Sequence, residues 1–240
     1  MTTNVCNLLP NSKVFACDSR WSYETDNFFY YIDDSGYDKI CYTDKVLAVF
    51  AGNASVIDSF KIWINNGCIG DMPYPEGTSI IAYNFVDDTH FKRNHSFTLP
   101  SKDVVEVIFS GSGTRDAIRS WRNNKCAIQA VKDACVTDLY TGGREKFFDI
   151  QSRNNNISST QLELSQLFNL LLREGFVMKK QVYQTMPYPL KDYVNDPEIR
   201  NDLFALSSGK ASFDAPSPEA EMKWDEEEVQ ELNLFFQKCR

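Results

Sequence analysis

The chain opens with Met1-Thr2-Thr3, and a threonine at the first position of a mature chain can serve as the nucleophile of a hydrolase. In such a residue the hydroxyl and the α-amine lie on adjacent carbons, and a free α-amine has a pKa of roughly 7.7–8. The amine can therefore accept the hydroxyl proton near neutral pH without a histidine. The site also needs a cation beside the amine, a carboxylate that holds this cation, and backbone N–H groups for the oxyanion.

Other hydrolytic chemistries have less support in the sequence. The two histidines, His90 and His95, lie in a polar stretch and are most simply surface residues, which disfavours a histidine-based zinc site or a Ser-His triad. We expect no metal and no organic cofactor. The cysteines are odd in number and form no Cys-x-x-Cys pair, so we expect buried, reduced thiols and a cytoplasmic location: Cys6, Cys17, Cys41, Cys68, Cys126, Cys135 and Cys239.

Composition limits the classes of partner. The net charge of −8 and the isoelectric point near 4.9 argue against a nucleic-acid-binding surface, which needs clustered lysines and arginines. No apolar run approaches the length of a membrane span, and residues 1–16 lack the basic head and long apolar stretch of a signal peptide. We therefore expect neither nucleic acid nor membrane among the partners of this chain.

The first two thirds of the chain carry the elements that would position a site around Thr2. Strand patterns occur within residues 3–18 (with a turn at 10–12), 28–32, 39–43, 45–52, 78–85, 90–99, 104–110 and 144–150. Helix patterns occur within residues 53–66, 113–122 and 124–137. This order is typical of two sheets covered by helices, so we predict an α/β fold with four layers, α/β/β/α, over residues 1–153.

The remaining residues, 154–240, have a different character and are predicted to form a largely helical C-terminal extension packed on this domain. A capping signal, Ser158 to Gln161, leads into an apolar helix near 160–174 that Gly175 closes. Residues 184–220 are rich in Pro, Ser and Asp and show little periodicity. A second, amphipathic helix is expected near 224–238, with Val229, Leu232 and Phe236 on its apolar side.

Four short blocks occur in a fixed order within residues 2–152. They are the opening Met-Thr-Thr with the strand pair that ends in VFACDSR (14–20), then KVLAVFAGNA (45–54), FSGSGT (109–114) and DLYTGG (138–143). Together the four blocks resemble the proteasome β-subunits and the related bacterial ATP-dependent threonine peptidase, which belong to the N-terminal-nucleophile hydrolases. The resemblance implies their four-layer fold and a threonine-type peptidase activity, and it does not extend to the C-terminal third.

The resemblance also implies roles for individual residues. Thr2 would be the nucleophile once Met1 is removed, and its α-amine the base. Asp18 would be the carboxylate that orients a lysine, and Gly52 would provide the oxyanion N–H. Three further residues would support the amine and a water: Ser112, Asp138 and Thr141. The substrate pocket would be formed by Ser22, Phe50 and Ala54, with Phe50 at its floor and backbone pairing to extended substrate at Ala54. As alternatives, Asp18 and Asp138 would only cap turns, and Ser112 would only begin a helix.

Two departures from the family concern the lysine and one helix. The stretch KICYTDKV offers Lys39 and Lys45, and we favour Lys39 because Lys45 matches a solvent-facing turn position. The loop from residue 66 to 78 is too short for the second helix of the family. Because that helix contributes to packing between subunits in the family's rings, the usual ring assembly is in doubt.

Two functions remain open from the sequence. The first is a hydrolase of peptide bonds, or of other amide bonds, with a peptide or protein substrate, a homo-oligomeric assembly and an ATPase unfoldase as the implied partners. The second is a proteasome-fold protein that does not cleave and acts as a binding or regulatory module through its C-terminal extension. In that second case we expect Leu167, Leu171 and Phe236 to support a binding surface.

Overall fold

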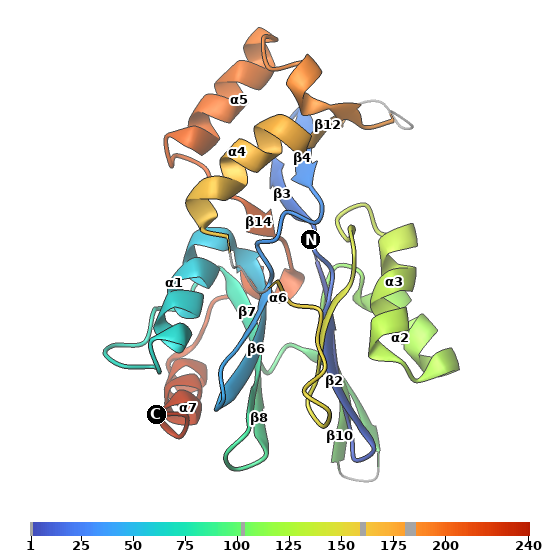
Figure 1. Ribbon diagram of the computed structural model, residues 1–240, viewed down its shortest axis with the longest axis vertical. Coiled ribbons are helices and arrows are strands. Elements are labelled where there is room, and N and C mark those ends of the chain that lie inside the picture. Colours follow the sequence, from blue (N-terminus) through green and yellow to red (C-terminus); the bar gives the residue numbers. More distant parts are fainter. Residues whose placement is uncertain (1, 102–103, 159–161, 181–185) are drawn as a thin grey trace.

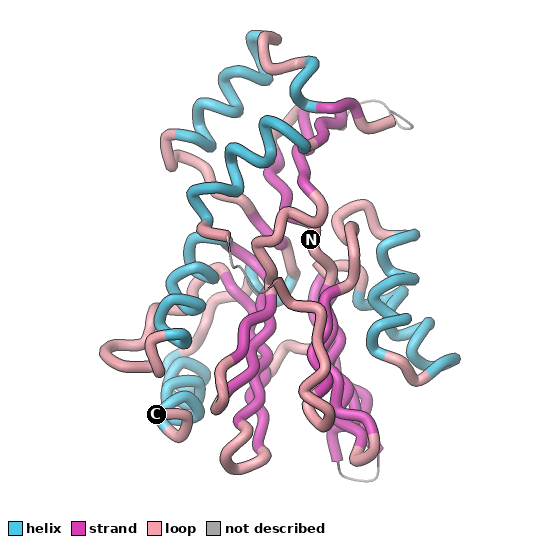
Figure 2. Tube along the Cα trace, in the orientation of Figure 1, coloured by secondary structure: helices cyan, strands magenta, loops and turns pink. Residues whose placement is uncertain are grey.

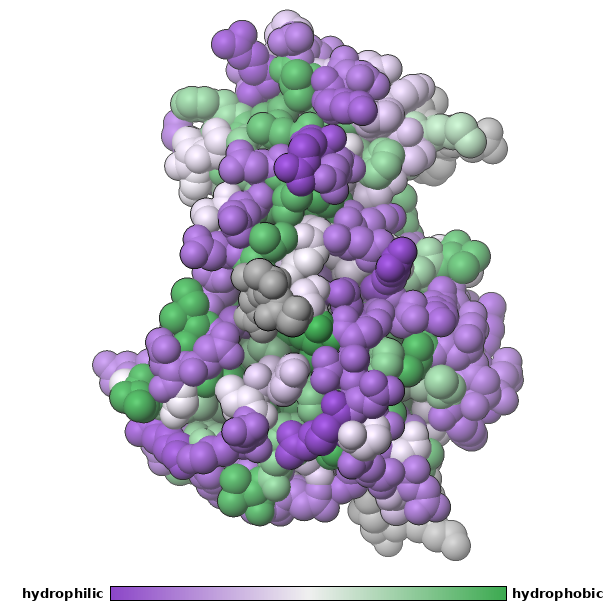
Figure 3. Space-filling view, in the orientation of Figure 1, coloured by the Kyte–Doolittle hydropathy of each residue, from purple (hydrophilic) through white to green (hydrophobic). Residues whose placement is uncertain are grey.

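Two antiparallel β-sheets form the centre of the protein, and helices cover the outer face of each (Figure 1). The structure is a computed structural model that describes residues 2–101, 104–158, 162–180 and 186–240. Figure 2 shows the strands of the two sheets facing each other, with the helices outside them. The visible face of the molecule is mostly hydrophilic, and its hydrophobic residues form small, separate groups (Figure 3).

The first sheet has five strands and carries the N-terminus on its central strand. Its order is β11 (Lys146–Asp149), β2 (Ser12–Cys17), β1 (Thr3–Leu9), β10 (Val104–Gly111) and β9 (Phe97–Ser101). In the register of β1 and β10, Thr3 lies opposite Gly111, so the Gly-Ser-Gly turn that follows β10 adjoins the start of the chain. The predicted strand pair within residues 3–18 is therefore present and places Thr2 at one end of the sheet.

The second sheet has nine strands and includes three from the C-terminal third of the chain. Its order is β13 (Tyr188–Pro189), β12 (Phe176–Lys179), β4 (Phe28–Ile32), β3 (Trp21–Glu24), β14 (Asp214–Ala215), β6 (Val46–Asn53), β7 (Thr78–Asn84) and β8 (Thr89–Lys92), and β5 (Ile40–Tyr42) pairs with β6. The two-residue strand β14 thus separates β3 from β6 in the middle of the sheet.

Alternation along the strands divides the apolar residues into layers, because successive side chains of a strand point to opposite faces. Cys6 and Ile108 of the first sheet pack with Leu47, Val49 and Ile81 of the second in one buried cluster between the sheets. The outer face of the first sheet, which includes Val5 and Phe109, packs on helices α2 (Thr114–Asn124) and α3 (Ala127–Thr137).

The outer face of the second sheet supports the largest group of buried residues. Helix α1 (Ala54–Asn65) packs there together with α4 (Leu164–Glu174), α5 (Pro197–Ser207) and α7 (Glu226–Gln237). The short elements η1 (Leu190–Asp192) and α6 (Pro218–Glu221) complete the chain. Leu167, Leu171 and Phe236 are fully buried in this cluster, so they are core residues, and a binding surface on the extension would depend on them through packing.

Most helices lie where the sequence predicts them, and the differences concern the C-terminal third. Residues 66–77 form turns and no helix, as the short loop predicts. The expected capping signal at Ser158 extends over residues 159–161, which lie outside the described residues, and α4 begins only at Leu164. Helix α5 was not predicted, although Asp196 caps it by accepting from two N–H groups and Pro197 is its first residue.

Along the part of the chain that the structure describes, no helix is long and apolar enough to cross a membrane.

Candidate active site

Thr2, Asp18 and Lys39 come together at the end of the central strand of the first sheet. The Lys39 ammonium donates to the Thr2 hydroxyl, with Nζ 2.8 Å from Oγ1. The same ammonium lies 3.0 Å from each carboxylate oxygen of Asp18, and the Thr2 hydroxyl donates to Oδ1 of that carboxylate. All three residues are 0% exposed. A hydroxyl, an ammonium and a carboxylate therefore form one closed, buried triangle of hydrogen bonds.

Backbone donors hold the Asp18 carboxylate in this position. Asp18 directly follows β2, and its Oδ1 accepts from the N–H of Thr3 at 3.0 Å. Its Oδ2 accepts from the N–H groups of Arg20 at 3.1 Å and Gly142 at 3.2 Å. The bond to Arg20 is the local turn contact expected of an aspartate, and the bonds to Thr3 and Gly142 join three distant segments. Asp18 thus stabilises a turn and also positions Lys39.

Of the two candidate lysines, Lys39 is at the site and Lys45 is not. Lys39 precedes β5, and its carbonyl accepts from the Phe50 N–H at 2.9 Å, which fixes the Lys39 backbone against β6. Its ammonium also lies 5.5 Å from the centroid of the Trp21 ring. Lys45 is exposed and donates to the carbonyl of Arg240 at 2.5 Å. The ammonium that can polarise the Thr2 hydroxyl is therefore that of Lys39.

Ser112, Asp138 and Thr141 form a second network beside the first. Both hydroxyls donate to Oδ2 of Asp138, the Thr141 hydroxyl at 2.6 Å. Thr141 also shares a hydrogen bond of 2.8 Å with the hydroxyl of Thr3. The three residues that the family resemblance groups together are thus in contact, and their connection to the N-terminal strand runs through Thr3, one residue after the proposed nucleophile.

Neighbouring thiols are poor competitors for the nucleophilic role. Burial raises the pKa of the Cys17 thiol, and the charge of Asp18 raises it further. Burial likewise raises the pKa of Cys135 to about 12, with Asp18 acting in the same direction. Both thiols are protonated near neutral pH, and a thiol is a much weaker nucleophile than a thiolate.

Gly52 occupies a position that excludes a side chain. Its φ is +109°, and a Cβ there would overlap the Gly77 carbonyl and lie 2.8 Å from the Cα of Thr78. Glycine is therefore required for β6 to approach β7 this closely. Phe50, two residues earlier, is fully buried, and its ring centroid lies 6.2 Å from that of Phe60. The expected pocket floor is thus packed into the core in this structure.

Ser22 and Ala54, the other two residues expected to line the substrate pocket, already have a backbone partner. The Ala54 N–H donates to the carbonyl of Phe213 at 3.0 Å, and the Ser22 hydroxyl donates to the carbonyl of Asp214 at 3.3 Å. The segment that provides these carbonyls, residues 213–215, has no strand pattern in the sequence. The proline at 216 after a short apolar-polar-apolar run is a strand-end signal, but two residues are too few for a pattern to predict.

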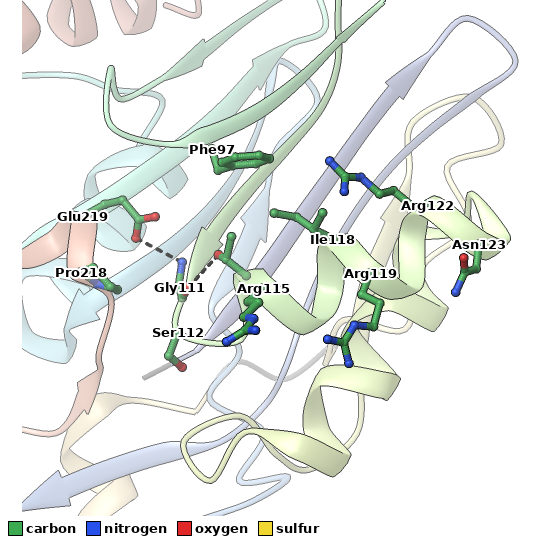
Figure 4. A pocket seen from close by; sticks show the side chains of 11 residues that line it. Phe97, Gly111, Ser112, Arg115, Ile118, Arg119, Arg122, Asn123, Pro218 and Glu219 are labelled. Carbon is green, nitrogen blue, oxygen red and sulfur yellow. Dashed lines mark hydrogen bonds between the residues drawn. The ribbon is translucent and has the colours of Figure 1, made fainter.

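A groove with a volume of about 700 Å³ lies between α2 and α6. Ser112 and Gly111 line it near the site, and Arg115, Arg119 and Arg122 extend along α2. Figure 4 shows Glu219 of α6 directed at Gly111, and the Glu219 carboxylate accepts a hydrogen bond of 3.2 Å from the Gly111 N–H. Among the described residues, no group of three or more His, Cys, Asp and Glu side chains is placed to hold a metal ion.

No known family model matches the sequence, and no curated protein matches it. The solved structures that are similar to the chain include the following two. Eukaryotic HslV from Trypanosoma brucei is 15% identical, with a TM-score of 0.43 over 60% of this chain and 97% of that one. BPH from Thiobacillus denitrificans, in complex with epoxomicin, is 11% identical, with a TM-score of 0.42 over 61% of this chain and 97% of that one. Both likenesses are distant, and the chemistry of the site rests on the geometry of this chain.

Proposed function

We propose that the protein is a threonine-type N-terminal-nucleophile hydrolase that cleaves peptide bonds through Thr2 after Met1 is removed. The observation that carries this proposal is the position of the Lys39 ammonium, 2.8 Å from the Thr2 hydroxyl and 3.0 Å from both Asp18 oxygens. A buried cation beside a hydroxyl lowers the free energy of its deprotonation, which a purely structural threonine does not need. Met1 itself lies outside the described residues.

In the proposed reaction, Oγ1 of Thr2 attacks the carbonyl carbon of the substrate while the free α-amine takes the hydroxyl proton. The N–H of Gly52 donates to the resulting oxyanion, and Lys39, held by Asp18, keeps the site electropositive. The intermediate then collapses: the C–N bond breaks, the amine returns the proton to the leaving nitrogen, and an ester to Thr2 remains. Water, activated by the same amine, hydrolyses this ester and restores the hydroxyl.

The remaining parts of the proposal concern fold and assembly. We assign residues 1–153 to the four-layer arrangement of N-terminal-nucleophile hydrolases and residues 154–240 to an extension packed on it. The network of Ser112, Asp138 and Thr141 would support the amine and the hydrolytic water from the side of Thr3. A homo-oligomer and an ATPase unfoldase are the partners proposed, although residues 66–77 provide no helix for the ring contact of the family.

The mass of the intact protein tests the first requirement of this proposal. We expect a chain that begins at Thr2, and a retained Met1 would refute the proposal because Thr2 would then have no free amine. An epoxyketone probe for N-terminal threonine tests the second. It should add once to the wild-type chain or to a Phe213→Ala chain, in which the segment beside Gly52 is more weakly anchored. An adduct on a Thr2→Ala chain would contradict the mechanism. The absence of an adduct from both the wild-type and the Phe213→Ala chains would also contradict it.

One observation favours the second function, that of a binding module without cleavage. Thr2 is fully buried, and the segment that contains Asp214 occupies the positions where an extended substrate would pair. In that case Thr2→Ala would leave the biological activity of the protein unchanged. A loss of activity in the Thr2→Ala protein, with an unchanged melting temperature, would reject the module and support the hydrolase.

A further inference from the structure

Strand β14 lies in the place that an extended peptide would take between β3 and β6. Asp214 pairs with Ser22 on one side and with Asn53 on the other, and Ala215 pairs with Gly52. Both ladders are antiparallel. An extended peptide bound by strand addition would make the same two ladders, since main-chain hydrogen bonds provide the affinity in this mode of recognition.

The side chains around β14 show that the segment is anchored and not merely adjacent. Phe213 is 4% exposed and belongs to the large core cluster on the outer face of the second sheet. Ala215 is fully buried opposite Gly52. Ser212, just before them, donates to the side chain of Asn53 at 3.4 Å. The positions thus alternate between an apolar anchor, a polar residue and a small buried residue.

After β14 the chain crosses from the second sheet to the first, next to the N-terminal strand. Pro216 provides no N–H, so the ladder cannot continue, and α6 follows. The Cβ of Ala220 in α6 lies 3.0 Å from the point that a Cβ on Gly52 would occupy. Glu219 reaches the first sheet at Gly111, the register partner of Thr3. The segment therefore spans the space between the two sheets at the end where Thr2 is buried.

Arg93 binds the C-terminal end of this segment, at residues 219–223. Its buried guanidinium donates to the carbonyls of Glu219, Met222 and Lys223, the last two at 3.1 Å and 3.0 Å. It also lies 3.1 Å from the Glu228 carboxylate of α7. The C-terminal helix and the crossing segment are thus held by one side chain of the domain core.

We propose that residues 213–221 form an intramolecular latch that occupies the peptide-binding site of this chain and must leave before a substrate enters. The proposal rests on the proposed function. It also specifies the ligand class: an extended peptide with a small residue opposite Gly52 and a large apolar residue two positions before it, as Ala215 and Phe213 are in the latch. The order Ala215-Pro216 places a proline after the small residue, where the ladder ends.

Peptide binding tests the latch separately from catalysis. The probe is a fluorescein-labelled hexapeptide with the sequence of residues 212–217, Ser-Phe-Asp-Ala-Pro-Ser. It is titrated by fluorescence polarisation into chains that all carry Thr2→Ala, so no cleavage can occur. Phe213→Ala removes the anchor of the latch, Ala215→Glu places a charge in its buried position, and Phe204→Ala is the matched control, since Phe204 is an exposed aromatic of α5.

We expect the hexapeptide to bind at least about tenfold more tightly to the Phe213→Ala and Ala215→Glu chains than to the reference or the Phe204→Ala chain. The apparent dissociation constant scales inversely with the fraction of molecules whose site is vacant, which explains the direction of the change. A hexapeptide in which Ala replaces the Phe should bind the opened chains less tightly. Unchanged affinity in Phe213→Ala, the milder variant, overturns the latch whether or not Ala215→Glu folds.

A cross-link provides the converse test. Ser22 and Asp214 are register partners in an antiparallel ladder, the arrangement that brings side chains of neighbouring strands together, so an oxidised Ser22→Cys, Asp214→Cys chain would have its latch fixed in place by a disulfide. We expect oxidation to abolish binding of the hexapeptide and reductant to restore it, and equal binding in both states would overturn the proposal. A retained Met1 would refute the hydrolase alone, because peptide binding in the Thr2→Ala chains does not depend on the nucleophile.

Discussion

Replacing Asp214 by Asn should tighten the docking of the latch near neutral pH and change it little under acidic conditions. Burial raises the pKa of the Asp214 carboxyl from an ordinary 3.8 to about 6, and the charge of Glu221 acts in the same direction, whereas the N-terminal charge, the Ala215 N–H and the Lys39 ammonium lower the pKa. When the latch leaves the sheet, the carboxyl becomes solvated and its pKa returns to the ordinary value. The docked state therefore binds the proton more tightly than the undocked state does.

The sign and size of the effect follow from this difference. Docking is favoured most at a pH well below 3.8, where the carboxyl is protonated in both states, and it weakens as the pH rises from there through about 6. A pKa raised from 3.8 to about 6 corresponds to about 3 kcal/mol, or roughly a hundredfold in the docking equilibrium, near neutral pH. Asparagine has nearly the same shape and no charge to desolvate, so it removes this penalty.

Hydrogen exchange measured by mass spectrometry can report the docking equilibrium of residues 213–217. Comparing the wild-type and Asp214→Asn chains at the same pH cancels the intrinsic dependence of exchange on pH. We expect the wild-type amides to exchange about a hundredfold faster than those of the variant near pH 7.5, and only a few-fold faster near pH 4. The amides of β1, whose strand partners are β2 and β10, serve as the internal control.

Two results would refute this reasoning. A ratio of exchange rates that does not change with pH would mean that Asp214 has the same pKa in the docked and undocked states. A variant that exchanges faster than the wild type at neutral pH would mean that the ionised carboxylate stabilises the docked segment.

Two further predictions concern the buried triangle and the glycine of β6. Lys39→Met should abolish the epoxyketone adduct. It should also lower the free energy of unfolding, measured by denaturant titration, by about 3–5 kcal/mol, because it leaves the buried Asp18 charge unpaired. An adduct at the wild-type rate would contradict the role of Lys39. Gly52→Ala should lower the melting temperature and prevent hexapeptide binding in the latch variants, because its Cβ overlaps the Gly77 carbonyl. If the same latch variant binds the hexapeptide equally well with and without Gly52→Ala, the assigned peptide position is wrong.

The elements around the site were largely predictable because each has a local signal. The strand pair at residues 3–17 has alternating apolar residues around a Pro-Asn turn, and α1 begins at Asn53, whose side chain accepts from the N–H groups of Ser55 and Val56. The meeting of Thr2, Asp18 and Lys39 has no such signal, since these residues are separated by 16 and 21 positions. Their placement came from the order of blocks that resembles a family, and not from any pattern of the residues themselves.

The C-terminal third was harder to predict for physical reasons. Helix α5 has a clear start signal in Asp196-Pro197-Glu198, but the surrounding Pro, Ser and Asp residues obscured it. Strand β14 has only two residues, and its stability comes from neighbours on two strands about 160 and 190 positions away, which a sequence window does not sample. Segments whose structure depends on tertiary contacts give little periodic signal, and β14 is of this kind.

The position of β14 in the middle of the second sheet also affects how the chain completes its fold. Strands β3 and β6 are synthesised long before residues 214–215, yet β14 provides a pairing partner to both. During synthesis, the nascent chain therefore presents two unpaired strand edges until its last fifth has left the ribosome. Unpaired edges of this kind recruit strands from other molecules. A chaperone that shields Ser22 and Gly52, or an early pairing between β3 and β6, would protect the nascent protein from aggregation.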